Sequence, residues 1–167
     1  MKKKLADLSL LVIHLGSNSG YRNRFLRDAI FQIECRIGKI IDHSAIYETA
    51  AWGETDQRAF LNQAIVVETN LPPEDVLTIT QQIELASGRE WRYHWGPRTL
   101  DIDLIFYDQI IQHSDRLTLP HPYMPVRKFV LVPLVDIIPH WVHPQLLLPV
   151  SQLLLLCTDE SAVVKVI

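Results

Sequence analysis

The sequence predicts an α+β fold, in which helices pack on an antiparallel sheet. Two observations predict this fold. Strand-length runs of apolar and β-branched residues recur along the chain, and two of the segments between them instead carry apolar residues at helical spacing. The resulting order is strand, helix, strand, strand, helix, strand. That order is the split β-α-β, or ferredoxin-like, arrangement, with its helices on one face of the sheet.

The first strand and the first helix are predicted near the amino terminus. An apolar run over residues 8–15 ends at the turn-forming Gly16-Ser17-Asn18, as a strand does. Apolar residues at helical spacing then extend from Leu26 to Ile37 and predict a helix. Gly38 follows this stripe, and we place it as the C-cap of the helix.

Two further strands and a second helix follow. Residues 39–47 and 60–69 are predicted strands, and the polar residues 48–59 between them are a predicted loop. Pro72-Pro73 opens the second helix, because proline in the first turn costs no hydrogen bond. Gly88 closes that helix.

The remaining chain adds a fourth strand and smaller elements. Residues 100–107 alternate in character and predict the fourth strand, which a short hairpin-like segment follows. A short helix is predicted near residues 127–135, and Pro133 limits it because proline disrupts a helix interior. The apolar tail over residues 146–167 is expected to pack against the domain or against a partner chain.

Length, charge and cysteine content restrict the class of protein. The 167 residues predict one domain, 1–167, and the 48% apolar and 21% charged residues are ordinary for a globular protein. The net charge of −3 predicts no nucleic-acid partner, because it supplies no overall positive field. An anionic ligand must therefore meet a local cluster of cations. Cys35 and Cys157 show neither metal-site spacing nor a disulfide framework.

The apolar segments predict no membrane association. Lysines precede the apolar run over residues 8–15, as in a secretory signal. The run is short, however, His14 interrupts it, and no small-x-small cleavage site follows. No segment reaches the roughly 18 apolar residues of a membrane span. We therefore expect a cytoplasmic protein.

The strongest chemical signal is an acidic pair in the fourth predicted strand. Alternate side chains of a strand share a face, so Leu100, Ile102, Leu104 and Phe106 are predicted to point into the core. Asp101 and Asp103 are predicted to point the other way together. Mg²⁺ is typically held by one or two carboxylates and substrate phosphates, although an Asp-x-Asp alone more often marks a solvated strand face.

Cations surround this acidic pair in the sequence. They are Arg89, Arg92, His94 and Arg98 before it, and Arg116, His121, Arg127 and Lys128 after it. Arginine binds phosphate well because its planar fork donates two hydrogen bonds at once. Carboxylates that hold a metal beside arginines that hold oxygens are what a metal-bound triphosphate needs. Surface ion pairing within a loop is an equally good explanation of the cations by themselves.

A second kind of site is predicted between Tyr47 and Asn62. Flat apolar groups and amide groups alternate there, which suits a planar heterocycle with a polar edge. The residues are Thr49, Trp52, Gln57, Phe60 and Asn62. The glycine-rich Gly16-Ser17-Asn18-Ser19-Gly20 lacks the lysine of a P-loop, so this is not a P-loop protein.

Several blocks of the chain resemble one family, in the order that the family has them. Trp95-Gly96-Pro97-Arg98-Thr99-Leu100-Asp101-Ile102-Asp103-Leu104-Ile105 resembles the central motif of 6-hydroxymethyl-7,8-dihydropterin pyrophosphokinase. Shorter blocks also resemble that family: Gly16-Ser17-Asn18, Tyr47-Glu48-Thr49, Phe60-Leu61-Asn62, Glu84 with Gly88-Arg89, Leu117-Thr118-Leu119-Pro120-His121, and Arg127 with Phe129. The resemblance covers roughly residues 9–143. It implies a ferredoxin-like enzyme of folate biosynthesis that transfers diphosphate from Mg-ATP to a hydroxymethyl-pterin and releases AMP.

The resemblance also implies roles for individual residues. Asp101 and Asp103 are expected to bind two Mg²⁺ ions, and they are expected to form the catalytic group together with Arg89 and Arg98. The implied ATP-binding residues are Gln81, Glu84, Arg92, Arg98, Arg116, His121 and Arg127. The implied pterin-binding residues are Thr49, Trp52, Phe60, Asn62, Trp95 and Phe129.

Two other functions stay open at this point. One is a different Mg-dependent nucleotide transferase, such as a nucleotide-sugar enzyme, many of which also use Asp-x-Asp. The predicted strand order and the short chain argue against it. The other is a non-catalytic ferredoxin-like module that binds a nucleotide or a pterin, although such modules rarely gather two acids and so many arginines beside one strand. Small molecules are the expected partners, and the chain is expected to be a monomer or a weak homo-oligomer.

Overall fold

A computed structural model describes residues 8–51, 57–88 and 98–166 of the chain. Its centre is a six-stranded sheet in the order β5-β1-β4-β3-β8, with β2 also pairing with β4, and all of its strand pairs are antiparallel. The strands are β1 (Ser9–Ser17), β2 (Gly38–His43), β3 (Tyr47–Thr49), β4 (Phe60–Thr69), β5 (Asp101–Tyr107) and β8 (Val163–Lys165). The predicted β-α-β-β-α-β order is confirmed except that two strands, β2 and β3, stand where one strand was predicted, and the third predicted strand has the bounds of β4.

The second predicted strand is in fact two strands, so the prediction of one strand over residues 39–47 is wrong. Both β2 and β3 pair with β4, but Ser44 interrupts the ladder between them. The side-chain oxygen of Ser44 accepts the backbone N–H of Ala64 at 2.9 Å. In a regular strand pair a backbone carbonyl of the neighbouring strand would accept this N–H. Strand β3 resumes the pairing with β4 and brings Thr49 opposite Phe60, the first residue of β4.

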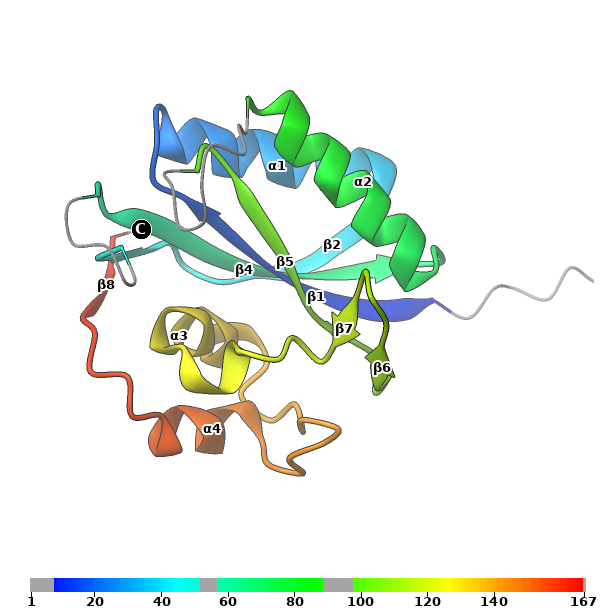
Figure 1. Cartoon of the computed structure of the whole chain (residues 1–167), viewed down its shortest axis with the longest axis vertical. Coiled ribbons are helices and arrows are strands. Elements are labelled where there is room, and N and C mark those ends of the chain that lie inside the picture. Colours follow the sequence, from blue (N-terminus) through cyan, green and yellow to red (C-terminus); the bar gives the residue numbers. More distant parts are fainter. Residues whose placement is uncertain (1–7, 52–56, 89–97, 167) are drawn as a thin grey trace, which may run out of the picture.

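Helices cover both faces of the sheet, which corrects the prediction of helices on one face. The first face packs against α1 (Arg22–Arg36) and α2 (Pro73–Ala86), and the second against α3 (Lys128–Ile137) and α4 (Val150–Leu156), as Figure 1 shows. The central strands are apolar on both sides: Leu11 and Ile13 belong to the first core, and Val12 to the second. A sheet that is apolar on both faces must be covered on both faces to keep those residues out of water.

The two glycines expected to close helices behave differently. Gly88 has a φ of +78° just after α2, as expected of a residue that ends a helix. Gly38 is not the C-cap of α1, because Ile37 is the C-cap and Gly38 opens β2. A Cβ atom at Gly38 would lie 2.0 Å from the carbonyl oxygen of Glu68. Gly38 therefore allows two backbones to approach closely.

A bulge in β5 changes which residues face the first core. Ile13 of β1 pairs with Leu104, but Val12 pairs with Phe106, so the strand skips Ile105. The extra residue shifts the alternation by one position. Phe106 accordingly packs in the second core, and the prediction that it shares a face with Leu104 is wrong. Asp101 and Asp103 precede the bulge and keep the predicted common face.

The chain after β5 forms the second helical layer and returns to the sheet. A small hairpin, β6 (Gln112–His113) and β7 (Thr118–Leu119), confirms the hairpin-like segment, and a 3-10 turn, Met124–Val126, leads into α3. The predicted short helix is confirmed as α3, and Pro133 lies inside it, with four more residues of the helix after the proline. Within the apolar tail, α4 packs on α3, and β8 pairs with β3 at the edge of the sheet.

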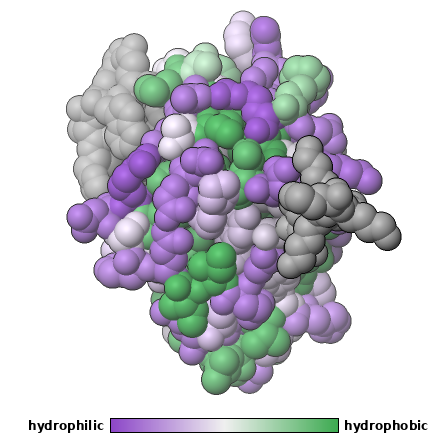
Figure 2. Space-filling model, turned by 90° about the vertical axis from the view of Figure 1, so that its right-hand side faces the viewer, coloured by the Kyte–Doolittle hydropathy of each residue, from purple (hydrophilic) through white to green (hydrophobic). Residues whose placement is uncertain are grey.

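The second helical layer also forms part of the molecular surface. Figure 2 shows apolar surface over the lower part of the molecule, where Figure 1 places α4 and the loop before it. Leu147 is 73% exposed and Leu155 is 84% exposed in this region. Among the described residues, no helix has the length and apolar character needed to cross a membrane.

Candidate active site

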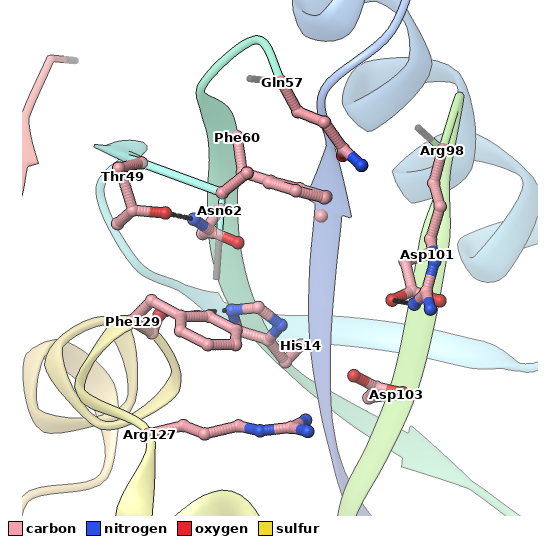
Figure 3. A pocket seen from close by; sticks show the side chains of 13 residues that line it. His14, Thr49, Gln57, Phe60, Asn62, Arg98, Asp101, Asp103, Arg127 and Phe129 are labelled. Atoms are coloured by element: carbon pink, nitrogen blue, oxygen red, sulfur yellow. Dashed lines mark hydrogen bonds and ion pairs between the residues drawn. The ribbon is translucent and has the colours of Figure 1, made fainter. Parts of the chain in front are cut away.

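The candidate site lies at one end of the sheet, on the face that α3 covers. Strand register brings its central residues together: Gly16 of β1 pairs with Asn62 on one side and with Asp101 on the other, and His14 pairs with Asp103. These positions share one face of the sheet. They line a pocket with about 650 Å³ of empty space, counting its open mouth. Figure 3 labels ten of the lining side chains: His14, Thr49, Gln57, Phe60, Asn62, Arg98, Asp101, Asp103, Arg127 and Phe129.

The acidic pair forms one wall of this pocket, as the strand alternation predicts. Asp101 is hydrogen-bonded to the guanidinium of Arg98, three residues before it. Both carboxylates are partly exposed, with side-chain exposures of 18% for Asp101 and 30% for Asp103. Within the described ranges, no group of three or more acidic, histidine or cysteine side chains gathers to hold a metal. Two carboxylates still fit Mg²⁺, because this ion usually takes its remaining ligands from water and substrate phosphates.

Asn18 fixes the position of Arg98 at the rim of the pocket. The Asn18 side-chain oxygen accepts the Arg98 backbone N–H at 2.7 Å, and the Asn18 backbone N–H donates to the Arg98 carbonyl at 3.0 Å. The Asn18 amide nitrogen also donates to Oε1 of Gln57 at 3.1 Å and to the carbonyl of Arg58 at 3.2 Å. Asn18, in the turn after β1, therefore connects Arg98 to Gln57 at the rim of the pocket. Asn18 itself is only 2% exposed.

Arg127 and His121 approach the acidic pair from the α3 side. Arg127 points across the pocket toward Asp103 in Figure 3. His121 Nε2 lies 4.0 Å from Asp103 Oδ1, which is too long for a hydrogen bond. Burial, and then the nearby Arg127 cation, lower the pKa of His121 to about 4. Its Nδ1 accepts the Tyr123 backbone N–H at 3.2 Å, so His121 is neutral at pH 7 and does not form an ion pair with Asp103.

The opposite end of the pocket is aromatic, with a buried amide. Phe60 of β4 and Phe129 of α3 lie on either side of an open space beside Asn62, as Figure 3 shows. Asn62 is 1% exposed and donates from its amide nitrogen to the Thr49 hydroxyl at 2.8 Å. Aromatic faces beside a fixed polar edge suit a flat heterocycle that carries hydrogen-bonding groups.

The structure brings some of the predicted site residues together and leaves others apart. Glu84 is buried on the other face of the sheet, where its carboxylate accepts the Ile102 backbone N–H at 2.8 Å. Gln81 is exposed on α2, and Arg116 is exposed near Thr78. Their roles in ATP binding stay predictions. Four other predicted site residues lie outside the described residues: Trp52, Arg89, Arg92 and Trp95.

The sequence analysis missed His14 as a site residue. His14 is 3% exposed and lines the pocket between Asp103 and Phe129. Burial lowers its pKa to about 4 and outweighs the opposing effect of Asp101. The only signal in the sequence is a polar residue within an apolar strand, two positions before Gly16. That signal is weak, because a histidine there could equally be a satisfied core residue.

The fold and this site together define a class of protein, a small α+β transferase that handles phosphate groups. Residues 12–139 match the family model of 7,8-dihydro-6-hydroxymethylpterin-pyrophosphokinase (HPPK), and the chain belongs to this family. The family resemblance found in the sequence is therefore confirmed.

Curated relatives of this family match most of the chain. The chain is 41% identical over 126 residues to 2-amino-4-hydroxy-6-hydroxymethyldihydropteridine pyrophosphokinase of Methylorubrum extorquens, covering 75% of this chain and 80% of the relative. It is 40% identical over 130 residues to the protein of the same name from Bacillus subtilis, covering 77% of this chain and 78% of the relative.

Solved structures show the same fold. The structure of the Plasmodium falciparum HPPK-DHPS triple mutant with STZ-DHP matches with a TM-score of 0.73 at 18% sequence identity. The match covers 91% of this chain and 44% of that chain, so this chain spans less than half the length of its structural neighbour. At 18% sequence identity the structural similarity is evidence for the fold alone. It confirms the predicted α+β class.

Proposed function

We propose that this chain transfers the diphosphate group of ATP to the hydroxymethyl group of 6-hydroxymethyl-7,8-dihydropterin and releases AMP, a step of folate biosynthesis. One observation carries the proposal. Strand register places Asp101, Asp103 and Asn62 on the same face of the sheet, so that one pocket has carboxylates and arginines at one end and aromatic rings with the amide of Asn62 at the other. The names of the curated relatives support the same reaction.

We propose that the donor, ATP, binds at the end of the pocket that contains Asp101. Asp101 and Asp103 are the residues that would hold two Mg²⁺ ions, which supply positive charge to the phosphate oxygens. Arg98 and Arg127 line the same end and donate to phosphate oxygens. The further ATP contacts that we propose are Gln81, Glu84, Arg92, Arg116 and His121, with Arg89 beside the transferred group.

We propose that the acceptor, a pterin, binds between Phe60 and Phe129. The two rings cover the faces of the heterocycle, and the Thr49–Asn62 pair meets its polar edge. Trp52 and Trp95 are proposed as additional contacts to the pterin. In this orientation the hydroxymethyl group points toward Asp103, on the side from which ATP is presented.

The chemistry then needs no covalent intermediate on the protein. The hydroxymethyl oxygen forms a bond to the β-phosphorus of ATP, the bond from that phosphorus to the oxygen shared with the α-phosphate breaks, and AMP leaves. The hydroxymethyl proton is released. Holding both reactants in line accounts for much of the rate, and the arginines stabilise the charge on the transferring oxygens. Closing the pocket around the pterin excludes water and favours transfer over hydrolysis.

We also propose how the protein is organised and where it works. Both cores share one sheet, which supports residues 1–167 as a single catalytic domain. ATP as the donor supports a cytoplasmic location. We also propose that the chain works as a monomer or a weak homo-oligomer.

The test is AMP formation from ATP, Mg²⁺ and 6-hydroxymethyl-7,8-dihydropterin, compared with the same mixture without pterin. We expect pterin-dependent AMP release that falls at least about 100-fold in Asp103→Ala, because a missing carboxylate leaves the phosphate charge uncompensated. Asp28→Ala is the matched control, since Asp28 is an exposed carboxylate on α1 that pairs only with Arg24 among the described residues. No AMP from the folded wild-type protein would overturn the proposed reaction. AMP release that survives Asp103→Ala would overturn the metal assignment.

A further inference from the structure

His14 is a buried polar side chain that the proposed reaction does not use. It lies in the middle of β1, where its neighbours across the sheet are Ala64 and Asp103. Its side chain is on the pocket face, beside the aromatic ring of Phe129: the two ring centroids are 5.8 Å apart, at 60° to each other. In Figure 3 the imidazole lies between Phe129 and the acidic wall. A buried polar group of this kind needs a hydrogen-bond partner.

The partner of His14 is the backbone of Phe129. His14 Nε2 lies 3.3 Å from the Phe129 carbonyl oxygen. A carbonyl oxygen only accepts, so Nε2 carries the proton and donates it. Burial keeps the ring neutral at pH 7 by lowering its pKa to about 4. The other nitrogen, Nδ1, is therefore unprotonated.

The Phe129 carbonyl is available to His14 because of Pro133. In an α-helix the carbonyl of one residue accepts the backbone N–H four residues later. Phe129 lies in the first turn of α3, and the residue four positions later is Pro133, which has no N–H. The proline ring also crowds the carbonyl four residues before it and turns it away from the helix axis. His14 supplies the donor that Pro133 cannot supply.

We propose that His14 is a positioning residue: through the carbonyl of Phe129 it fixes the start of α3 and thereby the aromatic wall on which the pterin stacks. The inference rests on the proposed function, because it assigns a pterin to the space beside Phe129. Phe129 is the second residue of α3, and few backbone hydrogen bonds hold a residue in the first turn of a helix. The hydrogen bond from His14 of the central strand β1 to the Phe129 carbonyl attaches the aromatic wall to the buried centre of the sheet.

Three variants at position 14 separate the hydrogen bond from the volume of the side chain. His14→Leu keeps a similar volume and removes the donor. His14→Gln retains an amide nitrogen at about the reach of Nε2, whereas His14→Asn retains one only at about the reach of Nδ1. We expect the pterin Kd to rise about fivefold in His14→Leu and His14→Asn, as for the loss of one hydrogen bond. We expect His14→Gln to stay within about twofold of wild type.

The assay is pterin binding, followed by the fluorescence of the pterin, with Mg²⁺ and a non-hydrolysable ATP analogue present. The Kd of the analogue is measured in parallel and should change less than about twofold, because the bond acts on the pterin wall. Ile13→Val is the matched control. Ile13 lies on the same strand but in the core on the opposite face, so the pterin Kd should not change. Thermal unfolding of each variant shows that the protein is folded.

Pro133→Ala tests the route of the effect. This substitution restores a backbone N–H for the Phe129 carbonyl, so the helix can satisfy it without His14. In the Pro133→Ala background, His14→Leu should change the pterin Kd by less than about twofold. An undiminished effect would show that His14 acts by another route and would overturn the inference.

The remaining outcomes distinguish the inference from the function on which it rests. Wild-type protein that neither binds the pterin nor forms AMP would overturn the proposed function, and the inference with it. Active wild-type protein with an unchanged pterin Kd in folded His14→Leu would overturn the inference alone. A rise in the pterin Kd that His14→Gln reverses and Pro133→Ala removes would establish it.

Discussion

Thr49 and Asn62 carry the polar edge of the pocket between them. They are 4% and 1% exposed, and their side chains are joined by a 2.8 Å hydrogen bond. Burial of an amide or a hydroxyl is unfavourable unless each finds a partner. The two residues are thirteen positions apart in the chain, and the pairing of β3 with β4 brings them together. The resemblance to the family nominated both residues, but only the strand register reveals that each satisfies the other.

This pair yields a prediction for a single hydroxyl group. Thr49→Val removes the hydroxyl with almost no change in shape and leaves the Asn62 amide without its acceptor. We expect the free energy of unfolding to fall by about 1–3 kcal/mol, the cost of an unsatisfied buried group. Thr49→Ser, which keeps the hydroxyl, is the control. Urea denaturation measures the difference, and equal stability of the two variants would contradict the prediction.

At the scale of the element, the carboxyl-terminal tail supports two parts of the pterin end of the pocket, the start of α3 and the strand that carries Thr49. Asp159 Oδ2 accepts the backbone N–H of Lys128, the first residue of α3, at 2.9 Å. Strand β8 pairs with β3, with Val163 opposite Thr49. Lys128 lies between Arg127 and Phe129 in the chain, so Asp159 holds the helix start that presents both residues to the pocket. The apolar pattern of the tail predicted packing but did not reveal this role.

Asp159 acts as a helix cap from outside the helix. Burial alone would raise its pKa, but hydrogen bonds from Ser161 and Lys128 outweigh burial and lower it. A carboxylate near a helix amino terminus is also favoured by the helix dipole.

We expect Asp159→Ala to lower the free energy of unfolding by about 1 kcal/mol, the usual value of a helix cap, and to raise the pterin KM more than the ATP KM. Asp159→Asn keeps an acceptor and should lose less. Chemical denaturation and initial rates measure these effects. An unchanged pterin KM in Asp159→Ala would show that the cap has no influence on the pocket.

At the scale of the whole molecule, burial keeps several histidines neutral. Burial is the largest cause of the lowered pKa of His14, His121 and His143, and the values for the first two are about 4. His143 Nδ1 accepts the backbone N–H groups of Gln145 at 3.2 Å and Leu146 at 3.1 Å, which requires an unprotonated nitrogen. In the unfolded chain these histidines take up protons near pH 6.5.

The stability of the protein should therefore depend on pH in a defined window. As the pH falls from 6.5 toward 4, the unfolded chain binds protons that the native protein does not, so the free energy of unfolding falls. Each such histidine contributes a slope of up to about 1.4 kcal/mol per pH unit, and the slope diminishes below the lowered pKa.

His143→Asn isolates one contribution, because an asparagine oxygen can accept the same backbone N–H groups without titrating. Urea denaturation between pH 7 and 4.5 should give a shallower slope for this variant than for wild type. Identical slopes would contradict the assignment.

Local patterns in the chain predicted much of the fold. Apolar periodicity placed β4 and the two helices of the first face, and strand alternation put Asp101 and Asp103 on one side of β5. These features depend on neighbours two to four residues apart, which the sequence states directly. The errors lie where distant segments decide. Gly38 opens a strand because the Glu68 backbone lies against it, and Phe106 changes face because β1 and β5 pair with a bulge.

The sequence by itself determined the acidic pair, the family and the strand and helix order, apart from the division of the second predicted strand into β2 and β3. The tertiary structure alone decided which side chains share the pocket: it brought His14 to the Phe129 carbonyl, Asn62 to Thr49 and Asn18 to Arg98, and it placed Glu84 on the opposite face. The physical reason is that a pocket is built from contacts between residues far apart in the chain. Those contacts follow from strand register and from the burial of two apolar faces, which no local pattern of residues specifies.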